Sequence, residues 1–374
     1  MPGLLPNVDP NGLLEYSVVY TDRALNHMSK AFQHVMRDIS RELKVVYKAR
    51  STIIVPGSGT FGMEAVARQF ATGKRCLVIR NGWFSYRWSQ IFDVGKIPAE
   101  VRVLKARPAE PGRLPCFTPP PVAEVVAAIR EFKPDVVFAP HVETASGIIL
   151  PDDYIRTVAE AVHAIGGLFV LDGIASGAIW VDMRACNVDV LISAPQKGWS
   201  ASACCAMVML GEEARRRIDF TRSTSFACDL RAWLGIMEAY EKGGHAYYAT
   251  LPTDALVVLH HAIIETAARG HDKLRVEQQC LGDAVRRLLR ERGFKSVAAA
   301  GFEAPTVVVS YTSDDAIKSG GKFAEAGLQV AAGVHLACDE PEDFKTFRLG
   351  LFGLDKLGNV ERTVASLAEA LDRL

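Results

Sequence analysis

Short apolar runs alternate with segments of helical periodicity between about residues 50 and 210. The apolar runs are continuous rather than alternating, which is typical of strands that helices cover on both faces. We therefore expect buried strands at residues 75–80, 101–105, 135–140, 168–172 and 188–194, and helices at residues 121–132 and 151–166. This alternation predicts a mostly parallel central sheet in an α/β fold.

The pattern changes near residue 225, where long segments of helical periodicity begin. We expect helices at about 228–243, 253–268 and 271–292, followed by a strand at 306–312, a helix at 314–326, a strand at 347–353 and a helix from 358. This second, shorter pattern predicts a smaller C-terminal α/β domain at 266–374 beside a large domain at 26–265. Residues 1–25 are expected to join the small domain.

Composition narrows the classes of partner. The 374 residues contain 43 basic and 43 acidic side chains, so no basic surface for nucleic acid or anionic lipid is expected. The eight cysteines show no zinc spacing, which predicts no metal site and favours reduced thiols in a cytoplasmic protein. Neither a signal peptide nor a membrane-spanning segment is evident. A small-molecule ligand is the expected partner.

The run Pro-Gly-Ser-Gly-Thr at residues 56–60 leads into a segment of good helix formers. Backbone N–H groups at a helix N-terminus, with the Ser58 and Thr60 hydroxyls beside them, suit a phosphate group. The run is not a P-loop, because no Gly-Lys-Ser/Thr follows. The alternative is an ordinary capped helix after a tight turn.

Two ionisable residues close buried strands. Lys197 follows the apolar run 188–194, and a lysine there is costly unless it is paired, deprotonated or covalently engaged. A desolvated amine of this kind suits Schiff-base chemistry. Asp172 ends the run 168–172, where it is either a helix cap, an ion-pair partner or the acid that keeps a cofactor ring nitrogen protonated.

The order of several separated motifs resembles the class V aminotransferases, most closely the alanine–glyoxylate and serine–pyruvate group. The motifs are Gly-Ser-Gly-Thr at 57–60, Asn-Gly-Trp-Phe-Ser-Tyr-Arg at 81–87, His-Val-Glu-Thr-Ala-Ser-Gly at 141–147, Asp172, Gln-Lys at 196–197 and Phe-Arg-Leu-Gly-Leu at 347–351. The resemblance covers about residues 30–374. It implies the fold type I architecture of enzymes that use pyridoxal 5′-phosphate (PLP).

The resemblance also implies roles for the residues at matching positions. Lys197 would hold PLP as a Schiff base and, once released, shuttle a proton, while Asp172 would bond the ring nitrogen. The other cofactor contacts would come from Ser58, Gly59, Thr60 and Gln196 at the phosphate, Phe84 and Ile174 on the two ring faces, and Thr144 at the ring hydroxyl.

For substrates and assembly, the resemblance implies a ping-pong transfer of an amino group from a small amino acid to glyoxylate or pyruvate. Arg348 would bind the substrate carboxylate, for which a guanidinium is well shaped. Tyr247 and Thr250 would reach the phosphate of a neighbouring subunit, which implies a homodimer with shared sites. The run at residues 15–29 departs from the family's usual Pro-Gly-Pro stretch, so the donor and acceptor are not specified.

Two other functions remain open from the sequence. A lyase or cysteine desulfurase could use the same scaffold, and Cys338 is the candidate mobile cysteine that a desulfurase needs. A non-catalytic binding protein on a degenerate scaffold is the other alternative, although the presence of Lys197, Asp172 and Arg348 together argues against it.

Overall fold

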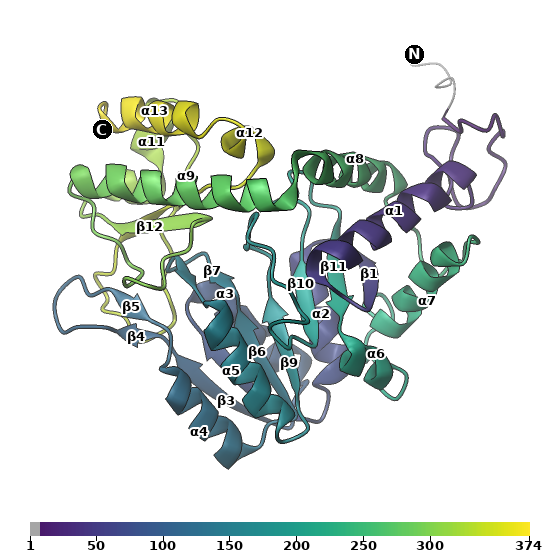
Figure 1. The fold of residues 1–374 in the computed structure, drawn as a ribbon, viewed down its shortest axis with the longest axis horizontal. Coiled ribbons are helices and arrows are strands. Elements are labelled where there is room, and N and C mark those ends of the chain that lie inside the picture. Colours follow the sequence, from purple (N-terminus) through teal and green to yellow (C-terminus); the bar gives the residue numbers. More distant parts are fainter. Residues whose placement is uncertain (1–7) are drawn as a thin grey trace.

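A seven-stranded sheet forms the centre of the computed structural model, which describes residues 8–374 (Figure 1). Its strands lie in the order β1 (Ser51–Pro56), β11 (Cys205–Leu210), β10 (Val190–Ser193), β9 (Leu168–Asp172), β6 (Val136–Pro140), β2 (Arg75–Arg80) and β3 (Glu100–Lys105). β11 runs antiparallel to both of its neighbours, and the other neighbouring pairs are parallel. The sheet is therefore mostly parallel, as predicted.

Helices pack around this sheet and bury its side chains. They are α1 (Lys30–Tyr47), α2 (Gly59–Phe70), α3 (Trp83–Gly95), α4 (Val122–Phe132), α5 (Asp152–His163), α6 (Glu212–Ile218), α7 (Leu230–Glu241) and α8 (Thr253–Arg269). α2 packs against β11, α3 against β2, α5 against β9 and α7 against β1. Because helices cover the central strands, every residue of β9, β10 and β11 is buried.

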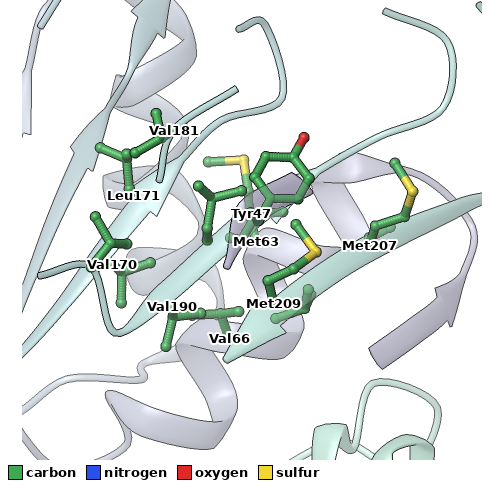
Figure 2. Packing of buried hydrophobic residues seen from close by; sticks show 14 of the residues in the cluster. Tyr47, Met63, Val66, Val170, Leu171, Val181, Val190, Met207 and Met209 are labelled. Carbon is green, nitrogen blue, oxygen red and sulfur yellow. The ribbon is translucent and has the colours of Figure 1, made fainter. Parts of the chain in front are cut away.

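The core between these layers is a mixture of β-branched and flexible apolar side chains. Figure 2 shows Met207 and Met209 of β11 in one apolar cluster with Val66 of α2 and Val190 of β10. Unbranched methionine adapts to irregular gaps between branched neighbours. This continuous burial is the physical reason that the strand sequences show runs of apolar residues rather than alternation.

A smaller sheet follows α9 (His271–Glu291) in the chain. Its antiparallel strands lie in the order β12 (Val307–Tyr311), β14 (Thr346–Gly350), β13 (Ala331–Ala332), and around it lie α10 (Asp315–Ser319), α11 (Gly321–Glu325), α12 (Leu354–Leu357) and α13 (Val360–Leu371). The single helix predicted at 314–326 is two short helices. They are separated at Gly320, whose φ of 84° lies in the left-handed region that glycine favours.

Two short antiparallel pairs complete the described chain. They are β4 (Arg107–Pro108) with β5 (Phe117–Thr118), and β7 (Val142–Glu143) with β8 (Ile148–Ile149). None of the helices described between residues 8 and 374 is long and apolar enough to cross a bilayer.

The N-terminal segment, expected to join the small domain, makes contacts elsewhere within this single chain. The Tyr20 hydroxyl donates to the Leu251 carbonyl at 3.0 Å, and the Leu25 N–H donates to the Asp254 carboxylate at 3.3 Å. Both partners lie at the start of α8, so in Figure 1 the segment lies on the opposite side of the molecule from α13. Residues 1–7 lie outside the described chain. The domain boundaries stay a prediction.

Candidate active site

The parallel strands of the large sheet end at one common edge, and the chain after five of them contributes to one cavity there. Its volume is about 180 Å³. The predicted residues that line it are Ser58, Gly59 and Thr60 after β1, Phe84 after β2, Thr144 after β6, Asp172 and Ile174 after β9, and Gln196 and Lys197 after β10. The crevice beyond the carboxyl ends of strands is where open α/β sheets bind ligands.

Ser58, Gly59 and Thr60, which line this cavity at the start of α2, present groups that suit an anion. Ser58 precedes α2, and its hydroxyl does not cap the helix, so it is free to face a ligand together with the N-terminal N–H groups. Glycine at position 59 allows the start of α2 to pack closely against Ile174, because a Cβ there would lie 2.5 Å from Ile174 Cδ1. The Thr60 hydroxyl accepts a hydrogen bond from Arg87 Nη1 at 3.0 Å. Arg87 therefore supplies a positive charge beside the turn at 58–60.

No role for Arg87 was predicted from the sequence. It follows Phe84 by three positions on α3, and side chains with that spacing share one helix face. Its guanidinium carbon lies 5.4 Å from the centre of the Phe84 ring. The helical spacing in the motif at 81–87 could have revealed that Arg87 and Phe84 point to the same site.

The Asp172 carboxyl group is buried. Within the described chain, no cationic side chain forms a hydrogen bond with it. Its one hydrogen bond there is accepted from the Ile174 N–H at 3.0 Å. Burial raises the pKa of Asp172 to about 7; the Ile174 N–H opposes this rise, and the negative charge of Glu143 adds to it. A buried carboxylate of this kind gains strongly from a cation placed beside it, as a protonated ring nitrogen would be.

Lys197 faces the same cavity from the turn after β10. Burial lowers the pKa of Lys197, the positive charge of Arg348 lowers it further, and the charge of Asp172 opposes both. Its ammonium nitrogen lies 5.0 Å from the centre of the Phe352 ring. A lysine with a lowered pKa is neutral more of the time, and only the neutral amine is a nucleophile.

Glu143 links two parts of the site, and no role for it was predicted from the sequence either. Its side chain is fully buried, and its carboxylate accepts hydrogen bonds from Phe84 N at 3.2 Å, Ser85 N at 2.8 Å, Ser85 Oγ at 2.6 Å and Ala145 N at 2.9 Å. It thereby ties the start of α3, which carries Phe84, to the loop that carries Thr144. The only feature of the sequence that could have indicated this role is the position of Glu143 next to Thr144.

Arg348 reaches the site from the smaller sheet. It lies on β14, is half-buried, and donates from Nε to the Ala332 carbonyl at 2.7 Å. Its guanidinium carbon is 5.3 Å from the Phe84 ring centre. Within residues 8–374 it forms no ion pair, so its charge is available to an anionic ligand. Together with Phe84, Thr144 and Lys197 it lines a second, larger cavity of about 620 Å³.

Tyr247 and Thr250 do not line either cavity of this chain. Their hydroxyls lie 3.1 Å apart within hydrogen-bond distance, and Tyr247 is 55% exposed. The Tyr247 ring centre is 5.5 Å from that of His27, which belongs to the N-terminal segment. Within this chain, these two predicted site residues therefore lie near the segment at 15–29 and outside the cavities that Lys197 lines.

Cys338 is poorly placed to act as the mobile nucleophile of a desulfurase. Its thiol is buried and donates to the Arg80 carbonyl at 3.4 Å. Burial raises the pKa of Cys338 to about 12, with the charges of Glu143 and Glu340 adding to the effect. The thiol is therefore protonated near neutral pH and does not line the cavity around Lys197.

The residues of the smaller cavity fit PLP. The turn at 58–60 and Arg87 suit its phosphate, the buried Asp172 carboxyl lacks a cation that the ring nitrogen would supply, and Lys197 is an amine with a lowered pKa. Among the described residues, no three His, Cys, Asp or Glu side chains gather as a metal ion would require.

Comparison with known proteins gives a family match over most of the chain. Residues 13–352 match the model of the family described as aminotransferase class-V. An alanine–glyoxylate aminotransferase of Rattus norvegicus is 25% identical over 371 residues, which cover 93% of this chain and 82% of the relative. An L-aspartate–glyoxylate aminotransferase of Paracoccus denitrificans is 24% identical, covering 73% of this chain and 67% of the relative.

Solved structures show the same fold. The crystal structure of an alanine–glyoxylate aminotransferase from Nostoc has a TM-score of 0.78 at 22% identity, covering 92% of this chain and 88% of that one. A ureidoglycine–glyoxylate aminotransferase from Bacillus subtilis has a TM-score of 0.77 at 19% identity, covering 98% of this chain and 89% of that one.

Proposed function

Since the chain belongs to the class V aminotransferase family, we propose that it moves an amino group from a small amino acid to a 2-oxo acid such as glyoxylate or pyruvate. It is a PLP-dependent transaminase, and the two substrates would use one site in turn. The observation that supports this best is the single cavity in which Lys197, Asp172 and the 58–60 turn meet. Arg348 lines the larger cavity, which shares Lys197 with the first.

Bound PLP supplies an electron sink for the bond-breaking steps, and the protein supplies position and charge. Ser58, Gly59, Thr60 and Gln196 would hold the phosphate, with Arg87 as an added cation. Asp172 would keep the ring nitrogen protonated, and Thr144 would bond the ring hydroxyl. Phe84 and Ile174 would pack against the ring.

Lys197 and Arg348 act on the substrate side. The Lys197 amine would hold the cofactor covalently and, as a free amine, would take up and return the proton of the substrate Cα. The lowered pKa of Lys197 suits this step, because the neutral amine is the base. Arg348 binds the α-carboxylate through its planar guanidinium and so fixes the Cα–H bond next to Lys197.

The proposal is tested with single half-reactions. Each candidate amino acid is added to the PLP-loaded enzyme without a 2-oxo acid, and the absorbance of bound pyridoxal is followed. A transaminase should lose this absorbance once per site and regain it on addition of glyoxylate or pyruvate. A lyase or desulfurase would turn over repeatedly without an acceptor, and a non-catalytic binding protein would show no change.

Arg348→Lys should raise KM for the amino acid and the 2-oxo acid together. Lysine keeps the charge but loses the two parallel N–H donors, so we expect a rise of roughly 10- to 100-fold. Steady-state kinetics with both substrates varied would measure it, and cofactor absorbance should stay normal. A rise for one substrate alone, or loss of PLP, would show that Arg348 has another role.

Glu143→Gln should weaken PLP binding and lower the free energy of unfolding. Glutamine keeps the size of the side chain, but its NH₂ group would face the N–H donors of Phe84 and Ser85. The mismatch is expected to cost about 1–3 kcal/mol. Urea unfolding and a PLP titration of the apoenzyme measure the two effects, with Glu100→Gln at an exposed strand end as the control. Equal PLP affinity in both variants would contradict the positioning role.

We further propose that the enzyme is a two-fold homodimer in which Tyr247 and Thr250 complete the phosphate site of the partner subunit. Both lie outside the cavity of their own chain, as such a role requires. Large apolar side chains nearby are highly exposed, as expected of a surface that another subunit covers. They are Leu13, Leu14, Tyr16, Val18 and Phe226.

Shared sites predict that two inactive variants restore activity when mixed. In a mixed dimer of Lys197→Ala with the Tyr247→Phe/Thr250→Ala variant, one site has both defects and the other has neither. With random exchange, roughly a quarter of the wild-type sites should reappear. Activity is compared before and after mixing, once the double variant alone is shown to be nearly inactive. Demonstrated subunit exchange without recovered activity would reject the shared site.

The cytoplasm is the compartment that we propose. All eight cysteines are free in the structure, which suits a reducing environment.

A further inference from the structure

The larger cavity beside Lys197 offers more room than a small amino acid fills. Its volume of about 620 Å³ is in the range of sites that enclose drug-sized ligands, which is about 300–1,000 Å³. It begins at Phe84, Thr144 and Lys197 and continues along β14 towards α12 and α13. The space therefore extends past Arg348 into the smaller α/β unit.

Apolar side chains form much of the wall beyond Arg348. They come from the segment before β13, from the two residues after β14 and from α13, and they are Leu328, Val330, Leu351, Phe352 and Leu367. The Phe352 ring lies beside the Lys197 ammonium, with 5.0 Å between the nitrogen and the ring centre. An apolar chain attached to a reacting Cα would meet this wall directly after the reaction centre.

The charged residues of the lining are all basic. Lys197 and Arg348 lie at the inner end, Lys356 lies on α12 and Arg362 on α13. Among the described residues, the lining includes no aspartate or glutamate. Lys356 donates to the Phe352 carbonyl at 3.1 Å, and Arg362 donates to the Asp355 carbonyl at 2.8 Å. Within residues 8–374 neither forms an ion pair, so their charges are not neutralised by a carboxylate.

We propose that this cavity binds the side chain of a second, larger substrate: an α-amino acid with an unbranched apolar stem that ends in an anionic group. Its α-carboxylate pairs with Arg348, its stem lies along Leu328 and Phe352, and its terminal anion faces Lys356 and Arg362. The inference rests on the proposed transamination and adds this donor to the small substrates of the same site.

The chemistry of the step is ordinary transamination. The donor Cα loses its proton and its amino group and gains a carbonyl oxygen from water. The amino group passes to the small 2-oxo acid, whose carbonyl oxygen leaves as water. No external oxidant or reductant is required, because the electron pair moves from the donor to the acceptor.

Three donors separate the contributions of the stem and of the terminal anion: L-alanine, L-2-aminooctanoate and L-2-aminosuberate, each with pyruvate or glyoxylate as acceptor. The last two have the same stem and differ in the terminal carboxylate. We expect kcat/KM to rise at least about tenfold from alanine to 2-aminooctanoate, because each buried methylene contributes. A further rise of about tenfold for 2-aminosuberate should diminish with added salt.

Variants of the wall and of the basic end test the assignment. Leu328→Trp or Val330→Trp should reduce the advantage of 2-aminooctanoate over alanine by about tenfold, because the indole fills the space. Lys356→Gln/Arg362→Gln should remove the advantage of 2-aminosuberate over 2-aminooctanoate. Arg287→Gln, an exposed arginine on α9 outside the lining, is the matched control.

Binding without turnover gives an independent measurement. Suberate and octanoate cannot react, so their dissociation constants for the PLP-loaded enzyme can be compared by calorimetry. Suberate should bind about tenfold more tightly, and the Lys356→Gln/Arg362→Gln variant should lose this difference. Normal turnover of alanine with no preference for the longer donors would overturn this inference and leave the proposed function intact. Absence of transamination with every donor would overturn the proposed function and the inference with it.

Discussion

Replacing Lys197 with alanine should abolish transamination, with turnover reduced at least about 10⁴-fold. Among the described residues, Lys197 is the one amine that lines the smaller cavity, together with Asp172 and the 58–60 turn. Without it the cofactor has no covalent attachment, and no group remains to move the proton between substrate and cofactor. The other contacts stay in place, so the variant should still bind PLP noncovalently.

Two measurements check this result. Turnover is compared with that of Lys74→Ala, which removes an exposed lysine far from the site. Borohydride treatment of the PLP-loaded wild-type enzyme, followed by peptide mapping, should place the pyridoxyl label on the peptide that contains Lys197. A label on another lysine would show that the attachment site is elsewhere.

Asp172→Asn should lower kcat/KM roughly 10²- to 10³-fold, which corresponds to about 3–4 kcal/mol and is in the range for a buried charge pair that loses one partner. Asparagine is almost the same size, but it cannot carry the negative charge that keeps a proton on the ring nitrogen. Asp283→Asn, at an exposed position of α9, controls for the substitution itself. Near-normal turnover in Asp172→Asn would mean that the ring nitrogen points elsewhere.

The same residue should give the apoenzyme a specific pH dependence. Burial raises the pKa of Asp172 to about 7, from an ordinary value of 3.8. Below the ordinary value the carboxyl is protonated in the folded and unfolded states alike, so its contribution to stability is fully present. As the pH rises towards 7, the unfolded state loses the proton first, and on the order of a few kcal/mol of stability is lost.

Urea unfolding of the apoenzyme between pH 4 and pH 7 measures this loss, which should be smaller in Asp172→Asn. PLP should oppose it in the wild type, because a protonated ring nitrogen stabilises the ionised carboxylate. Parallel pH profiles for the two apoproteins would contradict the raised pKa.

Local sequence was sufficient to predict most of the large sheet and the residues that end its strands. The runs at 75–80, 135–140 and 168–172 are strands because long apolar stretches can be buried on both faces only between helices. Asp172 and Lys197 stood out because a polar group directly after such a run lies at the ligand-binding edge. β1 and β11 were not predicted, since a short apolar run does not by itself distinguish a strand from a buried helix.

Only the tertiary structure decided how distant segments meet. Glu143 bonds to Ser85 across 58 positions, and Arg87 bonds to Thr60 across 27. Arg348 reaches Phe84 from a separate sheet, and Cys338 is buried by packing that its neighbours in the sequence do not reveal. Such contacts depend on how helices and sheets cross, which local periodicity does not encode. The residue types of the site could therefore be predicted from the sequence, whereas their hydrogen bonds, pKa shifts and the shape of the substrate cavity arise from packing.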